Sequence, residues 1–119
     1  MSVQESPETS RLLANDRRKY VRFRFVAPIE IIRSEGTSQQ GLTIEISDGG
    51  MSLATDETLQ IGERVELDPV IDGKVSAIVR HKQGRIYGFE FLSLSAEHVS
   101  LIRTTCRHLP FFSARSLNI

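Results

Sequence analysis

Residues 42–55, LTIEISDGGMSLAT, hold the pattern that decides the fold of this 119-residue chain. Over residues 42–47 apolar side chains alternate with polar ones, which is the period of a β-strand with two different faces. The Asp-Gly-Gly at residues 48–50 is the strongest turn signal in the chain, because both glycines can take positive φ without steric cost. A short strand over residues 51–55 completes a predicted hairpin.

The same alternation recurs on both sides of this hairpin. A long first strand over residues 21–32 precedes it, bent at Pro28 because proline cannot donate a ladder hydrogen bond, and residues 34–40 form a polar loop. Three further alternating segments follow, at residues 63–67, 75–80 and 85–92. Six short strands separated by turns predict an all-β fold, a six-stranded antiparallel barrel.

The C-terminal part of the chain predicts one α-helix. Ser95 can cap its first turn, and Pro110 cannot continue it. Apolar residues recur at helical spacing, at Val99, Ile102, Cys106 and Leu109. Because one amphipathic helix cannot bury such a stripe alone, we expect the helix to pack on the barrel.

Length and composition predict a single folded domain. The chain has 13.4 kDa and 39% hydrophobic residues, which is ordinary for a globular protein of this size. Residues 1–16 are polar and are predicted to form a flexible lead. We expect the barrel and helix to occupy residues 17–109 and a short tail to occupy residues 110–119.

The distribution of charge excludes some classes of partner. The formal net charge is zero, and residues 35–72 carry nine acidic side chains against one basic, so we expect no nucleic acid partner. No apolar run reaches the roughly 18 residues of a membrane span, and the N-terminus lacks the apolar centre of a secretory signal. We therefore expect a cytoplasmic protein with no membrane insertion.

The reactive side chains do not form a catalytic pattern. Cys106 is the only cysteine, and on a helix it belongs to the apolar stripe, whereas His108, two residues away, faces elsewhere. His81 lies near a predicted turn and needs no role. Without a nucleophile, base and orienting group in a recognisable order, we predict no enzymatic activity, no metal site and no cofactor.

Two local segments carry more chemistry than packing requires. Arg18 and Arg22 are four residues apart, where the lead meets the first strand. A guanidinium can grip guanine's O6 and N7 acceptors, stack on its ring and neutralise phosphate. In the hairpin, the strand that carries Glu45 and Ser47 ends in a polar turn, where Gly50 would let a ligand approach the backbone closely.

In this order, ahead of six strands and a closing helix, the two segments resemble the PilZ family of bacterial cyclic di-GMP receptors. The family motifs are R-x-x-x-R and (D/N)-x-S-x-x-G. Residues 87–94, YGFEFLSL, also resemble the family's last strand entering its helix, and the resemblance covers roughly residues 16–109. Arg18 and Arg22 match the first motif, Ser47 and Gly50 match the second, and Glu45 stands where the family has Asp or Asn. The resemblance implies a split barrel of PilZ type.

The resemblance also implies a binding switch rather than catalysis. Cyclic di-GMP, which has two guanines and two negative charges, would lie between the arginine-bearing N-terminal segment and the second motif. Ordering of that segment on the nucleotide would then signal to a partner protein. The ligand-binding residues implied are Arg17, as an auxiliary cation, with Arg18, Arg22, Glu45, Ser47 and Gly50.

A second function stays open at this point, a degenerate PilZ-like adaptor that binds a protein partner without nucleotide. Glu45 carries its carboxylate one methylene further out than the aspartate of the family. Beyond the predicted helix, Phe111 and Phe112 either dock back on the barrel or contact a partner.

Overall fold

The computed structural model describes residues 22–110, so the predicted lead and the tail beyond Pro110 lie outside the described residues. The described chain forms seven strands and one helix. They are β1 (Phe23–Arg24), β2 (Pro28–Arg33), β3 (Ser38–Ile46), β4 (Gly50–Ala54), β5 (Arg64–Asp68), β6 (Val75–Gln83), β7 (Ile86–Phe91) and α1 (Ala96–Cys106).

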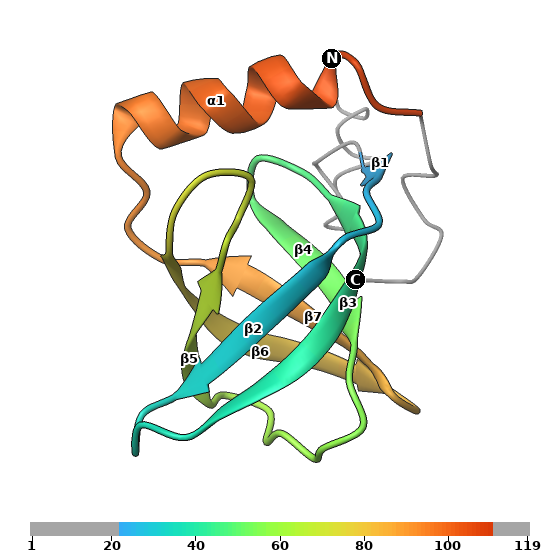
Figure 1. Ribbon diagram of the computed structural model, residues 1–119, viewed down its shortest axis with the longest axis vertical. Helices are drawn as coiled ribbons and strands as arrows, with labels where there is room; N and C mark the ends of the chain where they lie inside the picture. The colour runs from blue at the N-terminus through green and yellow to red at the C-terminus, as the bar shows by residue number, and fades with distance from the viewer. Residues whose placement is uncertain (1–21, 111–119) are drawn as a thin grey trace, which may run out of the picture.

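Six of the strands close into an antiparallel barrel. Their order is β3-β2-β5-β6-β7-β4, and β4 pairs again with β3 to complete the ring, whereas the two-residue β1 pairs only with β3. Helix α1 lies across one end of the barrel (Figure 1). The predicted six-stranded barrel with a C-terminal helix is therefore confirmed.

The break in the first strand does not lie at Pro28, as predicted, but over residues 25–27, and Pro28 begins β2. The cause is Thr43 on β3, whose side chain is buried beside the break. Its hydroxyl accepts a hydrogen bond from the Ala27 amide at 2.8 Å and donates one to the Phe25 carbonyl at 2.6 Å. A threonine on the neighbouring strand, not the proline, therefore organises the interruption.

The alternation in residues 42–47 does not mark the core face of β3. Leu42 is 48% exposed and Thr43 is buried, because the register with β4 shifts at a bulge between Thr43 and Glu45. After the bulge Ile46 pairs with Met51 of the core, so Glu45, paired with Ser52, points away from the barrel interior. The strand also begins at Ser38, so the preceding loop is shorter than predicted.

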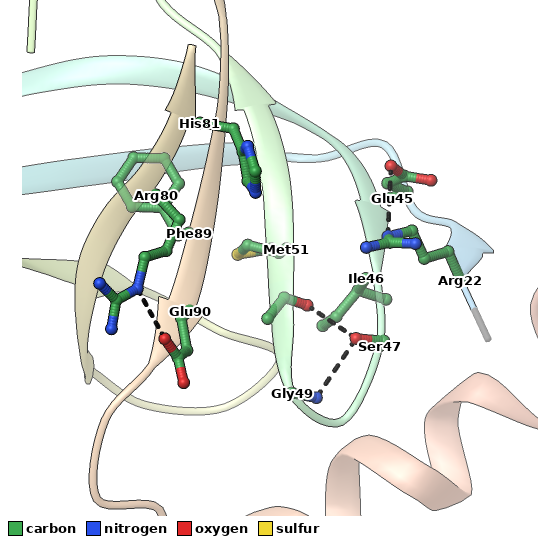
Figure 2. Close-up of a pocket in the computed structure, with 11 residues that line it drawn as sticks. Arg22, Glu45, Ile46, Ser47, Gly49, Met51, Arg80, His81, Phe89 and Glu90 are labelled. Carbon is green, nitrogen blue, oxygen red and sulfur yellow. Dashed lines mark hydrogen bonds and ion pairs between the residues drawn. The ribbon is translucent and has the colours of Figure 1, made fainter. Parts of the chain in front are cut away.

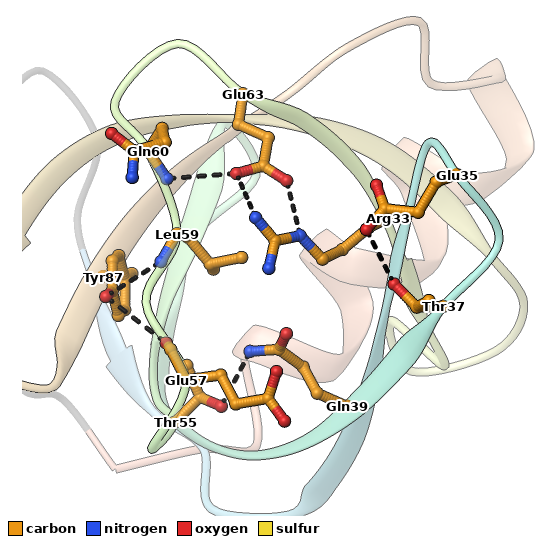
Figure 3. A network of polar contacts seen from close by, with 10 residues as sticks. All are labelled: Arg33, Glu35, Thr37, Gln39, Thr55, Glu57, Leu59, Gln60, Glu63 and Tyr87. Atoms are coloured by element: carbon orange, nitrogen blue, oxygen red, sulfur yellow. Dashed lines mark hydrogen bonds and ion pairs between the residues drawn. The ribbon is translucent and has the colours of Figure 1, made fainter.

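The end of β2 and the start of β5 lie at the end of the barrel opposite α1 (Figure 1), and an ion pair joins them there (Figure 3). Arg33, at the end of β2, donates to both carboxylate oxygens of Glu63, at 2.7 and 3.0 Å. The backbone amide of Gln60 donates to the same carboxylate at 3.0 Å. Burial alone would raise the pKa of Glu63, but the hydrogen bonds from Arg33 and Gln60 and the charge of Arg33 lower it.

Helix α1 follows the predicted pattern closely. Ser95 is the N-cap and accepts from the His98 amide at 3.0 Å, and Ile102 and Cys106 are buried against the barrel. Over residues 22–110 there is no helix long and apolar enough to cross a membrane.

Candidate functional site

The β3–β4 turn is shaped by its own serine. The Ser47 hydroxyl accepts from the Gly49 amide at 3.2 Å, and the Ser47 amide donates to the Gly50 carbonyl at 2.9 Å. Neither turn glycine uses the positive φ that is open to glycine. In the described chain the positive-φ glycines are Gly36, Gly62, Gly73 and Gly84.

Gly50 is needed for space rather than for an unusual φ. It pairs with Glu90 of β7, and a Cβ at Gly50 would collide with the carbonyl oxygen of Phe89. The turn and β7 are also joined by a hydrogen bond from the Phe91 amide to the Gly49 carbonyl at 3.0 Å. The missing side chain therefore lets β4 start directly against β7, which fixes the turn beside the barrel wall.

A hollow of about 170 Å³ opens beside this turn. Figure 2 shows its walls, which come from the segment before β1 and from β3, β4, β6 and β7. The lining residues are Arg22, Glu45, Ile46, Ser47, Gly49, Gly50, Met51, Arg80, His81, Phe89 and Glu90. Its polar walls and apolar floor are typical of a small-ligand site.

Arg22 and Glu45 form a buried ion pair on one side of the hollow. Their closest recorded atoms, Arg22 Nε and Glu45 Oε2, are 3.7 Å apart, and the two side chains are 10% and 1% exposed. That separation is longer than a hydrogen bond. Two residues from the two sequence motifs thus meet at the hollow, with opposite charges.

Arg80 and Glu90 form a second ion pair on the opposite side of the hollow, between Arg80 Nε and Glu90 Oε1 at 2.7 Å. The β6–β7 register shifts between Val79 and His81, so Arg80 lies in a bulge, and bulges redirect side chains. Neither sequence motif contains these two residues, and His81, expected near a turn, lies in β6 two residues before the strand ends at Gln83. One sequence signal could have indicated this bulge. The alternation of apolar residues stops at Val79, although the strand continues to Gln83.

The C-terminal helix and the residues that follow it contact the β3–β4 turn and β1 beside the hollow. Arg103 of α1 donates to Asp48 in the turn, with Nε 2.8 Å from Oδ2. The Arg24 amide on β1 donates to the Pro110 carbonyl at 2.9 Å. The turn and the strand that follows Arg22 are thus attached to the same C-terminal element.

Cys106 is a packed thiol in this structure. It is buried under α1, and burial together with the negative charge of Asp48 raises the pKa of its thiol to about 11. Such a thiol is protonated at neutral pH and is a poor nucleophile or metal ligand. Within residues 22–110 no three His, Cys, Asp or Glu side chains are grouped as a metal site.

The structure brings together four of the six residues predicted to bind ligand. Arg22, Glu45, Ser47 and Gly50 all line the hollow. Arg17 and Arg18 lie outside the described residues. The first motif is therefore represented at the hollow by its second arginine.

The chain is thus a small closed barrel, capped by a helix, with a charged hollow beside the cap. The sequence model of the PilZ domain family matches residues 16–108, so the chain belongs to this family. PilZ domains are receptor and adaptor domains, not enzymes. No curated protein matches the sequence significantly.

Solved structures share this fold at low sequence identity. The PilZ domain of YcgR from Escherichia coli, solved with cyclic di-GMP, superposes with a TM-score of 0.62 at 18% identity, covering 78% of this chain and 91% of that one. The Bacillus subtilis inhibitor of motility MotI/DgrA gives 0.63 at 23% identity, covering 77% and 50%. The PilZ domain of CeSA from a cellulose-synthesizing bacterium gives 0.58 at 17% identity, covering 73% and 95%.

Proposed function

We propose that this protein is a cyclic di-GMP receptor that binds the nucleotide at the hollow beside the β3–β4 turn and signals to a partner protein. The observation that carries the proposal is the meeting of Arg22 with Glu45, Ser47 and Gly50 around one hollow. One of the similar structures is a PilZ domain that contains cyclic di-GMP.

The chemistry of the hollow suits a guanine nucleotide. The guanidinium of Arg22 can pair with phosphate or with guanine O6 and N7, and the Glu45 carboxylate can accept from guanine's ring N–H and amino group. A ligand that offers an anion to Arg22 and donors to Glu45 compensates both partners of the buried pair. An adenine nucleotide lacks that pair of donors on the same edge, so we expect discrimination against cyclic di-AMP.

The described lining of the hollow has no net formal charge, so a doubly negative ligand needs positive charge from elsewhere in the chain. The charged residues of its described lining are two arginines, Arg22 and Arg80, and two glutamates, Glu45 and Glu90, which balance. Cyclic di-GMP carries two negative charges, so we assign the missing positive charge to Arg17 and Arg18, which precede Arg22 in the sequence. Their approach to the bound ligand would be the conformational change that a partner protein detects.

Calorimetric titration with cyclic di-GMP tests the proposal. We expect saturable binding by the parent, no binding of cyclic di-AMP, and a loss of about 100-fold or more for R22A and R18A, because each removes a charge-assisted contact. R85A is the control, since Arg85 lies outside the hollow in an exposed pair with Asp56. The proposal would be contradicted if the parent released no heat at tens of micromolar nucleotide. It would also be contradicted if R22A and R18A bound cyclic di-GMP as tightly as the parent.

The alternative, a protein-binding adaptor without nucleotide, is favoured by one observation. Glu45 already meets the charge of Arg22 inside the site, at 3.7 Å. Under this alternative the pair fixes β1 to the barrel, and R22A changes stability and partner recovery but no nucleotide affinity. Recovery of a partner that is independent of added cyclic di-GMP, together with a silent titration, would support it.

A further inference from the structure

The hollow has two charged sides of different character. Arg22 and Glu45 are nearly fully buried on the β3 side, whereas the side chains of Arg80 and Glu90 are 51% and 53% exposed on the β6–β7 side. Figure 2 shows the two pairs flanking the start of β4. Three strand spacings separate β3 from β6 through β4 and β7, which is about 14 Å along the sheet.

The volume of the hollow places part of the proposed ligand outside it. Pockets that enclose a drug-sized ligand measure about 300–1,000 Å³, and this hollow has about 170 Å³. We place one base of the ligand in the hollow and its second half on the open rim, where Arg80 is the exposed arginine of the described lining.

The geometry of Arg80 suits a contact with that second half. Its Nε is engaged by Glu90 at 2.7 Å, and the described residues provide no hydrogen-bond partner for its two terminal nitrogens. An arginine fork held at one edge can present the other edge to a phosphate in a bidentate arrangement. The exposed pair itself adds little stability, so its principal effect is to orient the guanidinium before the ligand arrives.

We propose that Arg80 is a further ligand-binding arginine, which pairs through its terminal nitrogens with a phosphate of the dinucleotide half that lies on the rim. Glu90 orients Arg80 and at the same time lowers the affinity, because it adds a negative charge beside a doubly anionic ligand. This inference rests on the proposed function and concerns the same site. It assigns the β6 bulge a role in recognition that neither sequence motif contains.

Opposite substitutions in the same pair test this role. Calorimetry with cyclic di-GMP is carried out on the parent, R80A, R80K and E90Q, at low and at physiological salt. We expect R80A to weaken binding about tenfold and to reduce its salt dependence. R80K should lie between R80A and the parent because it keeps the charge without the fork, and E90Q should bind about two- to threefold more tightly.

Two outcomes would overturn the inference while leaving the receptor function intact. One is R80A binding within twofold of a parent that does bind. The other is an equal loss in R85A, whose arginine is exposed and does not line the hollow, which would indicate a general charge effect. Weaker binding by E90Q would show that Glu90 contacts the ligand and does not compete with it. A parent that does not bind at all contradicts the proposed function itself.

Discussion

Two arginine–glutamate pairs lie at opposite ends of the barrel. The pair whose side chains are more exposed has the shorter distance between its charged atoms. Arg33 and Glu63, whose side chains are 22% and 16% exposed, are joined by two hydrogen bonds, at 2.7 and 3.0 Å. Arg22 and Glu45, at 10% and 1% exposure, approach only to 3.7 Å. The better-buried pair is the looser one.

This difference separates an ion pair that supports the fold from one that suits a binding site. Desolvation of two charges is offset only when their geometry is good and their remaining hydrogen bonds are made. Arg33–Glu63 meets that condition and closes the end of the barrel away from α1 (Figure 3). Arg22 and Glu45 are 3.7 Å apart, and both line the hollow where we propose that a ligand binds.

The largest effect is expected from removing the charge of Glu63. E63Q should lower the free energy of unfolding by about 2 kcal/mol, because a charge-assisted bidentate contact is lost at a partly buried site. E66Q is the matched control, since Glu66 forms an exposed pair with Lys74 at 3.8 Å and should cost less than about 0.5 kcal/mol. Urea denaturation measures both, and calorimetry should show unchanged affinity for cyclic di-GMP. A stable E63Q, or one that loses the ligand, would break the distinction between the two pairs.

A smaller effect is expected from shortening each glutamate by one methylene. E63D should cost about 1 kcal/mol, since its carboxylate can no longer reach both nitrogens of Arg33. E45D should cost a similar amount for the lost buried methylene, but it should tighten binding of cyclic di-GMP, because its carboxylate retracts from Arg22. Unfolding and titration of both variants provide the comparison. Weaker binding by E45D would show that the longer side chain is adapted to the ligand.

The smallest effect is the pH dependence of the Arg33–Glu63 pair. Because the folded-state pKa of Glu63 is lowered, its contribution to stability is present above its unfolded pKa of about 4.3 and is lost as pH falls through the folded value. The stability difference between parent and E63Q should be constant above about pH 5.5 and shrink below it. Equilibrium unfolding from pH 6 to pH 2.5 measures this difference. A gap that does not narrow in acid would show that the ionised carboxylate of Glu63 is not the source of the stability difference.

Local pattern predicted most of the fold. Alternation placed the later strands within a few residues, and the Ser95 cap with its apolar stripe placed α1. The errors lie where two strands interact. The break at residues 25–27 depends on Thr43 of a different strand, and the exposure of Leu42 follows from a bulge, neither of which has a local period.

The site was predictable only in part for the same reason. Arg22, Glu45, Ser47 and Gly50 belong to short motifs and could be singled out from the sequence. Arg80 and Glu90 reach the hollow because β6, β7 and β4 are neighbours in the closed barrel, and this order is not written in any one segment. The collision that excludes a side chain at Gly50 likewise comes from Phe89 of β7, which is remote from Gly50 in sequence.

The hydrogen bond between the Arg24 amide and the Pro110 carbonyl has a practical consequence for shortened versions of the protein. A chain cut at the last turn of α1 keeps every strand of the barrel but loses the acceptor that secures the shortest strand, two residues after Arg22. If the protein is the receptor that we propose, such a version should bind nucleotide more weakly than the full chain even though its site residues are intact. Trimming from residue 111 onward preserves this anchor and allows the tail to be tested on its own.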